Sequence, residues 1–150
     1  MAICKAMDLA HYIVDKSTRD DKPVSNLQLQ KMMYFIQYTH CKYYGEPLFD
    51  DEEFQAWQYG PVVPSVYDEY SSYGGRAITE LYEGVDRKTL FGRLADWVDS
   101  GIRVLRKYSP WDLVSVAHAK GSPWYRIWNN GAGRYDTIPN SLILESAVAS

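Results

Sequence analysis

The sequence predicts a mainly α fold: a compact single domain, residues 1–150, of about six to seven helices with a short extended segment near residues 53–59. Several stretches repeat apolar residues at three-and-four spacing, which is the period of an α-helix. Ser-Pro pairs and glycines stand where such stretches begin and end. A chain of 150 residues, 46% of them hydrophobic, is long enough to bury one sizeable core.

The first third of the chain predicts two helices. Residues 6–16 carry one apolar face, made of Met7, Ala10, Ile13 and Val14. A longer helix is predicted at residues 26–44, with Ser25 as its N-cap and Gly45 just after its last turn. The apolar residues of this longer helix form two stripes that cover nearly all of its sides. Such a helix is usually central and packed from several directions.

The middle of the chain alternates between patterned and unpatterned segments. Residues 53–59 alternate in polarity, which predicts the extended segment, and residues 64–73 show helical spacing that Gly74 ends. Residues 75–86 have the weakest pattern and are predicted to be a flexible link. Residues 87–108 are predicted to be a second long amphipathic helix.

The last third uses one helix-start signal twice. In Ser109-Pro110 and again in Ser122-Pro123, a serine suited to an N-cap precedes a proline suited to the first helical position. Residues 137–148, "TIPNSLILESAV", predict a last short helix.

Composition limits the classes of partner. The net charge is −3 and the basic residues are scattered, which argues against nucleic acid as the main partner, because phosphate binding needs clustered Lys and Arg. No apolar run is long enough to cross a bilayer, so no membrane partner is expected. Cys4 and Cys41 match no metal or redox spacing, and the chain is expected to be cytoplasmic with both thiols reduced.

The sequence predicts no enzyme, no metal site and no cofactor. The three histidines lack metal-ligand spacing, and no nucleophile elbow or phosphate-binding glycine loop is present. A catalytic pair could be drawn between His118 and either Asp112 or Ser115. A lone histidine near a helix end is more often a cap or a half-buried polar residue. The unusual feature is the aromatic content of 15%, with thirteen Tyr and five Trp, residue types that are enriched at protein interfaces.

The segment "QAWQYGPVVPSVYDEY" concentrates these aromatic residues around two prolines. Pro61 and Pro64 fix their own backbone φ and disfavour helix in the residue before each, while Gly60 permits a sharp turn. The Gly-Pro-Val-Val-Pro piece is therefore predicted to be a rigid corner between the extended segment and the next helix. The candidate partner-binding residues are the aromatic side chains around it: Trp57, Tyr59, Tyr67 and Tyr70.

Two blocks of the chain together resemble the Panacea antitoxin domain, a family of phage-associated or mobile-element proteins. The first runs from about residue 25 to 75 and contains "YGPVVP"; the second runs from about residue 111 to 143 and contains "AHAKGSPWYRIW" and "IPNSLI". The motif residues, for which a structural role is expected, are Gly60, Pro61, Val62, Pro64, His118, Ser122, Pro123 and Trp124. Ala117 stands where the family commonly has Thr.

The resemblance implies a small helical domain, encoded beside a protein toxin, that neutralises this toxin by direct binding in a toxin–antitoxin system with a role in phage defence. In a subset of the family the domain is a proteolytic adaptor that delivers the toxin to a cytosolic protease, so a protease or chaperone is a second expected partner. Two further alternatives stay open: an uncharacterised enzyme with His118 in its site, and a transcriptional autoregulator, which the charge disfavours.

Overall fold

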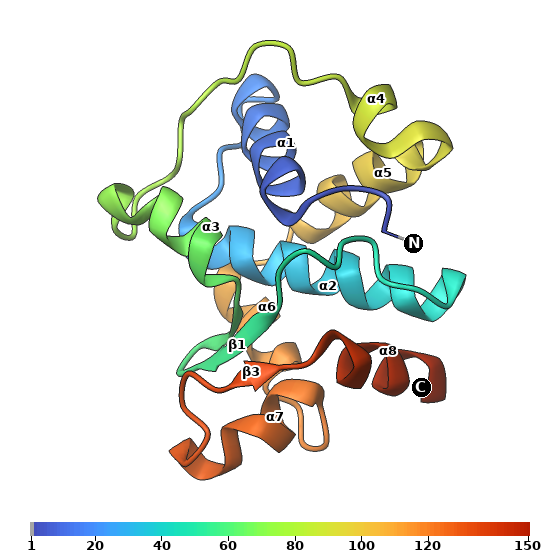
Figure 1. Ribbon diagram of the computed structural model, residues 1–150. Coiled ribbons are helices and arrows are strands. Elements are labelled where there is room, and N and C mark those ends of the chain that lie inside the picture. Colours follow the sequence, from blue (N-terminus) through green and yellow to red (C-terminus); the bar gives the residue numbers. More distant parts are fainter. Residues whose placement is uncertain (1) are drawn as a thin grey trace.

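The computed structural model describes residues 2–150 and confirms the mainly α fold (Figure 1). The long helix α2 (Asn26–Tyr44) runs through the middle of the molecule, with α1 (Ala6–Arg19) on one side and α8 (Asn140–Ala149) on the other. Helices α1, α3, α5, α6 and α8 and strand β2 all pack on α2. This position agrees with the prediction from its two apolar stripes.

The other helices are short and lie around this centre. They are α3 (Pro64–Glu69), α4 (Arg87–Phe91), α5 (Ala95–Leu105), α6 (Pro110–Ala117) and α7 (Pro123–Trp128), with three-residue 3₁₀ helices η1 (Ser71–Tyr73), η2 (Gly92–Leu94) and η3 (Asn129–Gly131). None of the helices in residues 2–150 has both the length and the apolar character needed to cross a membrane.

The predicted helix-start signals are confirmed. The side chain of Ser25 accepts a hydrogen bond from the backbone N–H of Gln28, and Gly45 ends α2 in the left-handed region at φ 72°. Ser109 and Ser122 cap α6 and α7 in the same way, each followed by a proline in the first turn. These ends are encoded locally, so the sequence alone located them.

The prediction of one continuous helix over residues 87–108 is wrong. The backbone breaks at Gly92, whose φ of 55° places it in the left-handed region, and α4 and α5 are separate helices joined by η2. A glycine in this conformation ends a helix at little steric cost. The amphipathic pattern therefore described two helices that share one buried side.

A three-stranded antiparallel sheet lies beside α2, with strand order β2-β1-β3. β1 (Phe54–Trp57) confirms the predicted extended segment. β2 (Gly60–Val62) pairs with β1 across a two-residue loop, and β3 (Thr137–Ile138) pairs with the other edge of β1. The predicted corner is therefore the turn and second strand of a hairpin, and β3 was not predicted.

Buried amide side chains of α2 fix the segments that cross it. The side-chain oxygen of Gln37 accepts hydrogen bonds from the N–H groups of Leu48 and Phe49 at 2.8 and 3.2 Å. The side-chain oxygen of Gln30 accepts one from the N–H of Val63 at 2.9 Å. Because the oxygen of each buried amide accepts from backbone N–H groups, the chain before β1 and after β2 is held in one register on α2.

Residues 75–86 form no helix, in agreement with their weak pattern, and cross over α1 (Figure 1). Several contacts attach them to the core. The N–H of Ile78 donates to the carbonyl of Val24 at 2.8 Å, and the N–H of Tyr82 donates to the Asp15 carboxylate at 2.8 Å. The Tyr82 ring stacks on His11 with centroids 4.2 Å apart.

Candidate functional site

An open groove with a volume of about 540 Å³ lies beside the hairpin, and we call it the aromatic groove. Five aromatic side chains line it: Trp57, Tyr59, Tyr67, Trp111 and Tyr135. Four of these are substantially exposed, with Tyr59 at 49%, Tyr67 at 37%, Trp111 at 57% and Tyr135 at 53% of their full accessible surface. An exposed aromatic cluster of this kind marks an interaction site more often than scattered single residues do.

The five aromatic residues come from five different segments. Trp57 ends β1 and Tyr59 lies in the hairpin loop, while Tyr67 is in α3. Trp111 is in the first turn of α6, and Tyr135 precedes β3. The groove exists because the hairpin, α3, α6 and the return strand meet at one end of α2.

The rings contact one another in three pairs, of which two are edge to face and one is tilted. Trp57 lies at the centre, with its ring centroid 4.9 Å from that of Tyr67 and 5.5 Å from that of Tyr135, the latter pair at 90°. On the other wall, the ring centroids of Tyr59 and Trp111 are 5.3 Å apart, and the two ring planes meet at 87°. Edge-to-face pairs are the favoured geometry of aromatic rings, so these side chains support one another while their outer faces remain open.

The floor of the groove is a chain of satisfied amides at the start of α2. Asn26 donates from Nδ2 to the carbonyl of Tyr67 at 3.0 Å, and Gln30 donates from Nε2 to Oδ1 of Asn26 at 3.1 Å. Both side chains are buried. Since Gln30 also accepts from Val63, α3 and the hairpin are tied to the same helix turn.

Tyr135 is held in an unfavourable backbone conformation. Its φ is 68°, in the left-handed region that bulky residues rarely adopt. Its N–H donates to the carbonyl of Ala56 at 2.7 Å, which ties it to β1. Two residues earlier, a Cβ on Gly133 would lie 1.8 Å from the carbonyl oxygen of Ile127, so only glycine fits there. Non-glycine residues in this region cluster at functional sites, which makes Tyr135 a candidate in its own right.

The structure corrects the prediction for Tyr70. Its side chain is 1% exposed, and its hydroxyl is hydrogen-bonded to that of Tyr82 at 2.7 Å. Burial raises the pKa of this phenol, and the bond to Tyr82 raises it further. Tyr70 is therefore a core residue with no face to offer a partner. The helical spacing of Tyr67 and Tyr70 could not reveal that the segment around Tyr82 covers only one of them.

The sequence missed Trp111, Tyr135 and Arg134 as lining residues of the groove. For Trp111 a signal existed, because it follows a Ser-Pro helix start in a first turn, which is often exposed. Tyr135 and Arg134 gave none, since their position depends on the pairing of β3 with β1, which brings them back from far along the chain. Trp57, Tyr59 and Tyr67 were grouped as predicted, and their role in binding remains a prediction.

The hairpin motif residues sit directly over a buried lysine that the sequence did not reveal. Lys31 is fully buried and donates from Nζ to the carbonyl of Pro61 at 2.8 Å, and burial lowers its pKa to about 7. Gly60 has a φ of 114°, and a Cβ there would lie 2.8 Å from Cε of Lys31. Val62 is buried and Pro64 begins α3, so this motif forms a compact structural joint.

The second motif forms a stack of rings behind the groove. The imidazole of His118 lies flat on the indole of Trp124 with centroids 3.8 Å apart, and Trp128 stacks on the other side at 5.2 Å. Burial lowers the pKa of His118, and the charge of Lys31 lowers it further. Trp124, in the turn that Ser122 and Pro123 begin, is 5% exposed.

Asp112, one of the two residues suggested as a partner of a catalytic His118, has another role. Asp112 accepts a hydrogen bond from the backbone N–H of Ser109 and completes the capping box of α6. The Nε2 atom of His118 is buried and, within residues 2–150, has no hydrogen-bond partner. His118 thus supports the Trp124 indole, in agreement with a structural role for the motif.

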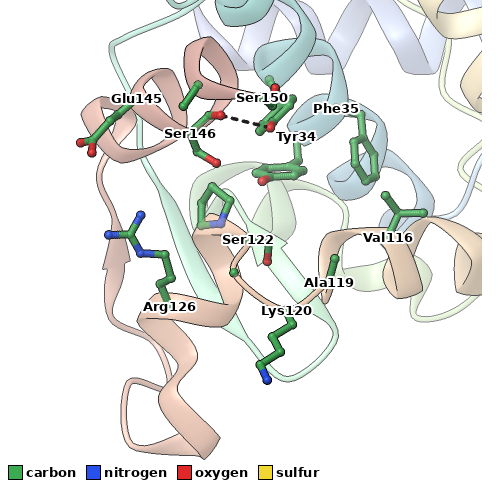
Figure 2. A pocket seen from close by; sticks show the side chains of 14 residues that line it. Tyr34, Phe35, Val116, Ala119, Lys120, Ser122, Arg126, Glu145, Ser146 and Ser150 are labelled. Carbon is green, nitrogen blue, oxygen red and sulfur yellow. Dashed lines mark hydrogen bonds between the residues drawn. The ribbon is translucent and has the colours of Figure 1, made fainter.

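A second cavity of about 530 Å³ lies between α2, the turn before α7, and α8 (Figure 2). Tyr34 and Phe35 of α2 form one wall, and Lys120, Arg126 and Glu145 bring charges of both signs to its rim. The hydroxyl of Tyr38 donates to the carbonyl of Ser146 at 3.4 Å, drawn as a dashed line. This cavity lacks the exposed aromatic rings of the groove, which makes the aromatic groove the stronger candidate for protein binding.

Comparisons with known proteins identify the family of the chain. The model of the family described as "Antitoxin SocA-like, Panacea domain" matches residues 29–125, which include Trp57, Tyr59, Tyr67 and Trp111. The chain is 31% identical over 135 residues to "Antitoxin SocA" of Caulobacter vibrioides (strain NA1000 / CB15N), covering 83% of this chain and 70% of the relative. No solved structure matches the chain. On these matches, the chain belongs to the antitoxin SocA-like, Panacea domain family.

Proposed function

We propose that this chain is the antitoxin of a toxin–antitoxin pair and that it neutralises a cognate protein toxin in the cytoplasm by direct binding at the aromatic groove. Family membership supports an antitoxin role. The observation that carries the location is the convergence of five aromatic side chains from five segments on one open surface.

The physical properties of the groove suit a protein partner. Tyr and Trp supply a large contact area with few rotatable bonds, so little side-chain entropy is lost when they are covered. The edge-to-face pairs and the satisfied floor hold the rings in place before binding, which lowers the cost of association further. Truncating one such anchor residue typically weakens an interface by 2 kcal/mol or more.

The experiment uses the protein encoded beside this chain as the toxin. Expressed alone, it is expected to arrest growth, and co-expression with the wild-type chain is expected to restore growth. The variant Trp111→Ala removes an exposed groove ring and should fail to restore growth at equal expression. Tyr43→Ala is the matched control, because Tyr43 is an exposed aromatic residue (68%) at the far end of α2 and should still rescue.

The fate of the toxin separates two modes of neutralisation. Direct sequestration leaves the toxin intact in a stable complex with this chain. An adaptor instead causes a protease-dependent loss of the toxin, which an immunoblot with and without the cytosolic protease detects. Rescue by Trp111→Ala as complete as rescue by the wild type, at matched protein levels, contradicts binding at the groove.

A further inference from the structure

The aromatic groove contains a single charged side chain, Arg134, among the described residues that line it. Its guanidinium carbon lies 5.0 Å from the ring centroid of Tyr135, so the cation rests on one of the groove rings. No carboxylate lines the groove, although the protein as a whole carries a net charge of −3. The groove is thus a locally cationic, aromatic surface on an acidic protein.

The positive charge of Arg134 has no acidic partner within residues 2–150. Three other arginines are paired: Arg19 with Asp15, Arg87 with Asp96 and Asp99, and Arg106 with Asp20. The carboxylate of Asp112, which follows the groove residue Trp111, is used by the capping box of α6. Arg134 therefore presents a guanidinium whose hydrogen-bonding fork is open to an incoming group.

The backbone around Arg134 fixes where this guanidinium can reach. Its N–H donates to the carbonyl of Gly131 at 3.2 Å, and the following residue, Tyr135, is tied to β1 through Ala56. Gly133, just before it, packs directly against the backbone of Ile127. The backbone that carries Arg134 is thus constrained, and the contact with the Tyr135 ring restricts the side chain, which lowers the entropy lost on binding.

We propose that the partner segment in the aromatic groove is an acidic-apolar one: a bulky apolar side chain seats among the rings, and an Asp or Glu carboxylate beside it pairs with Arg134. Charge complementarity selects this occupant, since an arginine fork matches a carboxylate in two parallel hydrogen bonds. A cationic partner segment is disfavoured, because Arg134 already occupies a face of the Tyr135 ring. A lysine or arginine of the partner would need a free ring face and would be repelled by the charge of Arg134. This inference rests on the proposed function.

The test measures the dissociation constant of the complex between this chain and the protein encoded beside it, with variants of the full chain. Arg134→Met keeps an apolar side chain against Tyr135 and removes the charge, and it should weaken binding by about tenfold or more. Arg134→Glu should weaken it further, and Arg134→Lys less than Arg134→Met. Arg126→Met is the control, since Arg126 is exposed on the second cavity, and it should stay within about threefold.

Salt dependence separates a charge contact from a role in supporting Tyr135. Raising the salt concentration should weaken wild-type binding more steeply than binding by Arg134→Met, because only the wild type makes the ion pair. Equal salt slopes, or an affinity of Arg134→Glu within about threefold of the wild type, overturn the proposal. If Trp111→Ala weakens binding in that case, the groove still holds the toxin and only the acidic contact is wrong. If neither variant weakens binding, the proposed site fails as well.

Discussion

The indole Nε1 of Trp124 donates a hydrogen bond of 2.7 Å to the backbone carbonyl of Trp57. This bond joins the two motif blocks, which are far apart in the sequence. Its acceptor belongs to the residue whose side chain forms the centre of the aromatic groove. The stack of His118, Trp124 and Trp128 is therefore joined to the strand that carries the central ring of the groove. Trp124 is buried, while four of the five aromatic residues that line the groove are exposed.

The first prediction is that Trp124→Ala destabilises the domain by about 3–5 kcal/mol, the usual cost of removing a buried tryptophan. The substitution empties the space between His118 and Trp128 and leaves the Trp57 carbonyl without its donor. Urea denaturation followed by circular dichroism measures the effect. Trp111→Ala, at an exposed tryptophan, should change the free energy of unfolding by less than about 1 kcal/mol. Equal losses in both variants contradict the assignment of one ring to the core and the other to the surface.

The second prediction compares two glycines in the left-handed region. Gly45→Ala costs about 1 kcal/mol, because at φ 72° an alanine is strained but a Cβ meets nothing within 4 Å. Gly60→Ala costs about 2 kcal/mol or more, because at φ 114° the Cβ also collides with Cε of Lys31. Because Lys31 is buried and bonded to Pro61, its side chain has little room to shift. Thermal and urea unfolding of the two variants test this order, and a Gly60→Ala protein as stable as Gly45→Ala refutes the close approach.

The third prediction concerns pH. Burial lowers the pKa of Lys31 from 10.5 to about 7, so between these values the unfolded chain binds more protons than the folded one. Stability rises with pH wherever the unfolded state binds more protons. The cost of burying Lys31 is thus fully present below pH 7 and decreases as the pH rises from 7 towards 10.5.

The matched variant is Lys31→Met, which has no group that titrates in this range. The free energy of unfolding of the wild type, taken relative to Lys31→Met, should therefore increase between pH 7 and 10 and stay level below pH 7. Urea denaturation across this range measures the difference. A difference independent of pH shows that the pKa of Lys31 is not lowered in the folded protein.

The fourth prediction separates stability from binding at Tyr135. Tyr135→Gly relieves the backbone strain at φ 68° and at the same time increases the entropy of the unfolded chain. These effects oppose each other, so the free energy of unfolding should change by less than about 1 kcal/mol. Loss of the ring should weaken toxin binding by about tenfold or more. Tyr135→Ala is the control: it also lacks the ring but keeps the strain, so it should bind equally weakly and be less stable than Tyr135→Gly.

Much of the helical fold was predictable, because its signals are local. Ser25, Ser109 and Ser122 cap helices through bonds to residues three positions away, and Gly45 ends α2 in the conformation that a glycine there favours. The break at Gly92 was missed because an amphipathic pattern continues across it with the same buried side. Periodicity locates a buried face but does not report the backbone conformation of a single glycine.

Half of the groove could not be predicted, because it depends on long-range contacts. Arg134 and Tyr135 enter it through the pairing of β3 with β1, and a two-residue strand leaves little pattern in the sequence. Tyr70 was assigned to the surface because its cover comes from Tyr82, in the least patterned segment. Lys31 was overlooked because a lysine in a helix is almost always exposed.

The most direct test of the central claim is calorimetric titration of the toxin encoded beside this chain into the double variant Tyr59→Ala/Trp111→Ala, which removes the one aromatic pair on its wall of the groove. Circular dichroism first verifies that the variant is folded, and Tyr43→Ala serves as the exposed aromatic control. Binding at the groove predicts at least about a tenfold loss of affinity for the double variant, and a change within about threefold for Tyr43→Ala. A folded double variant that binds the toxin as tightly as the wild type contradicts the claim.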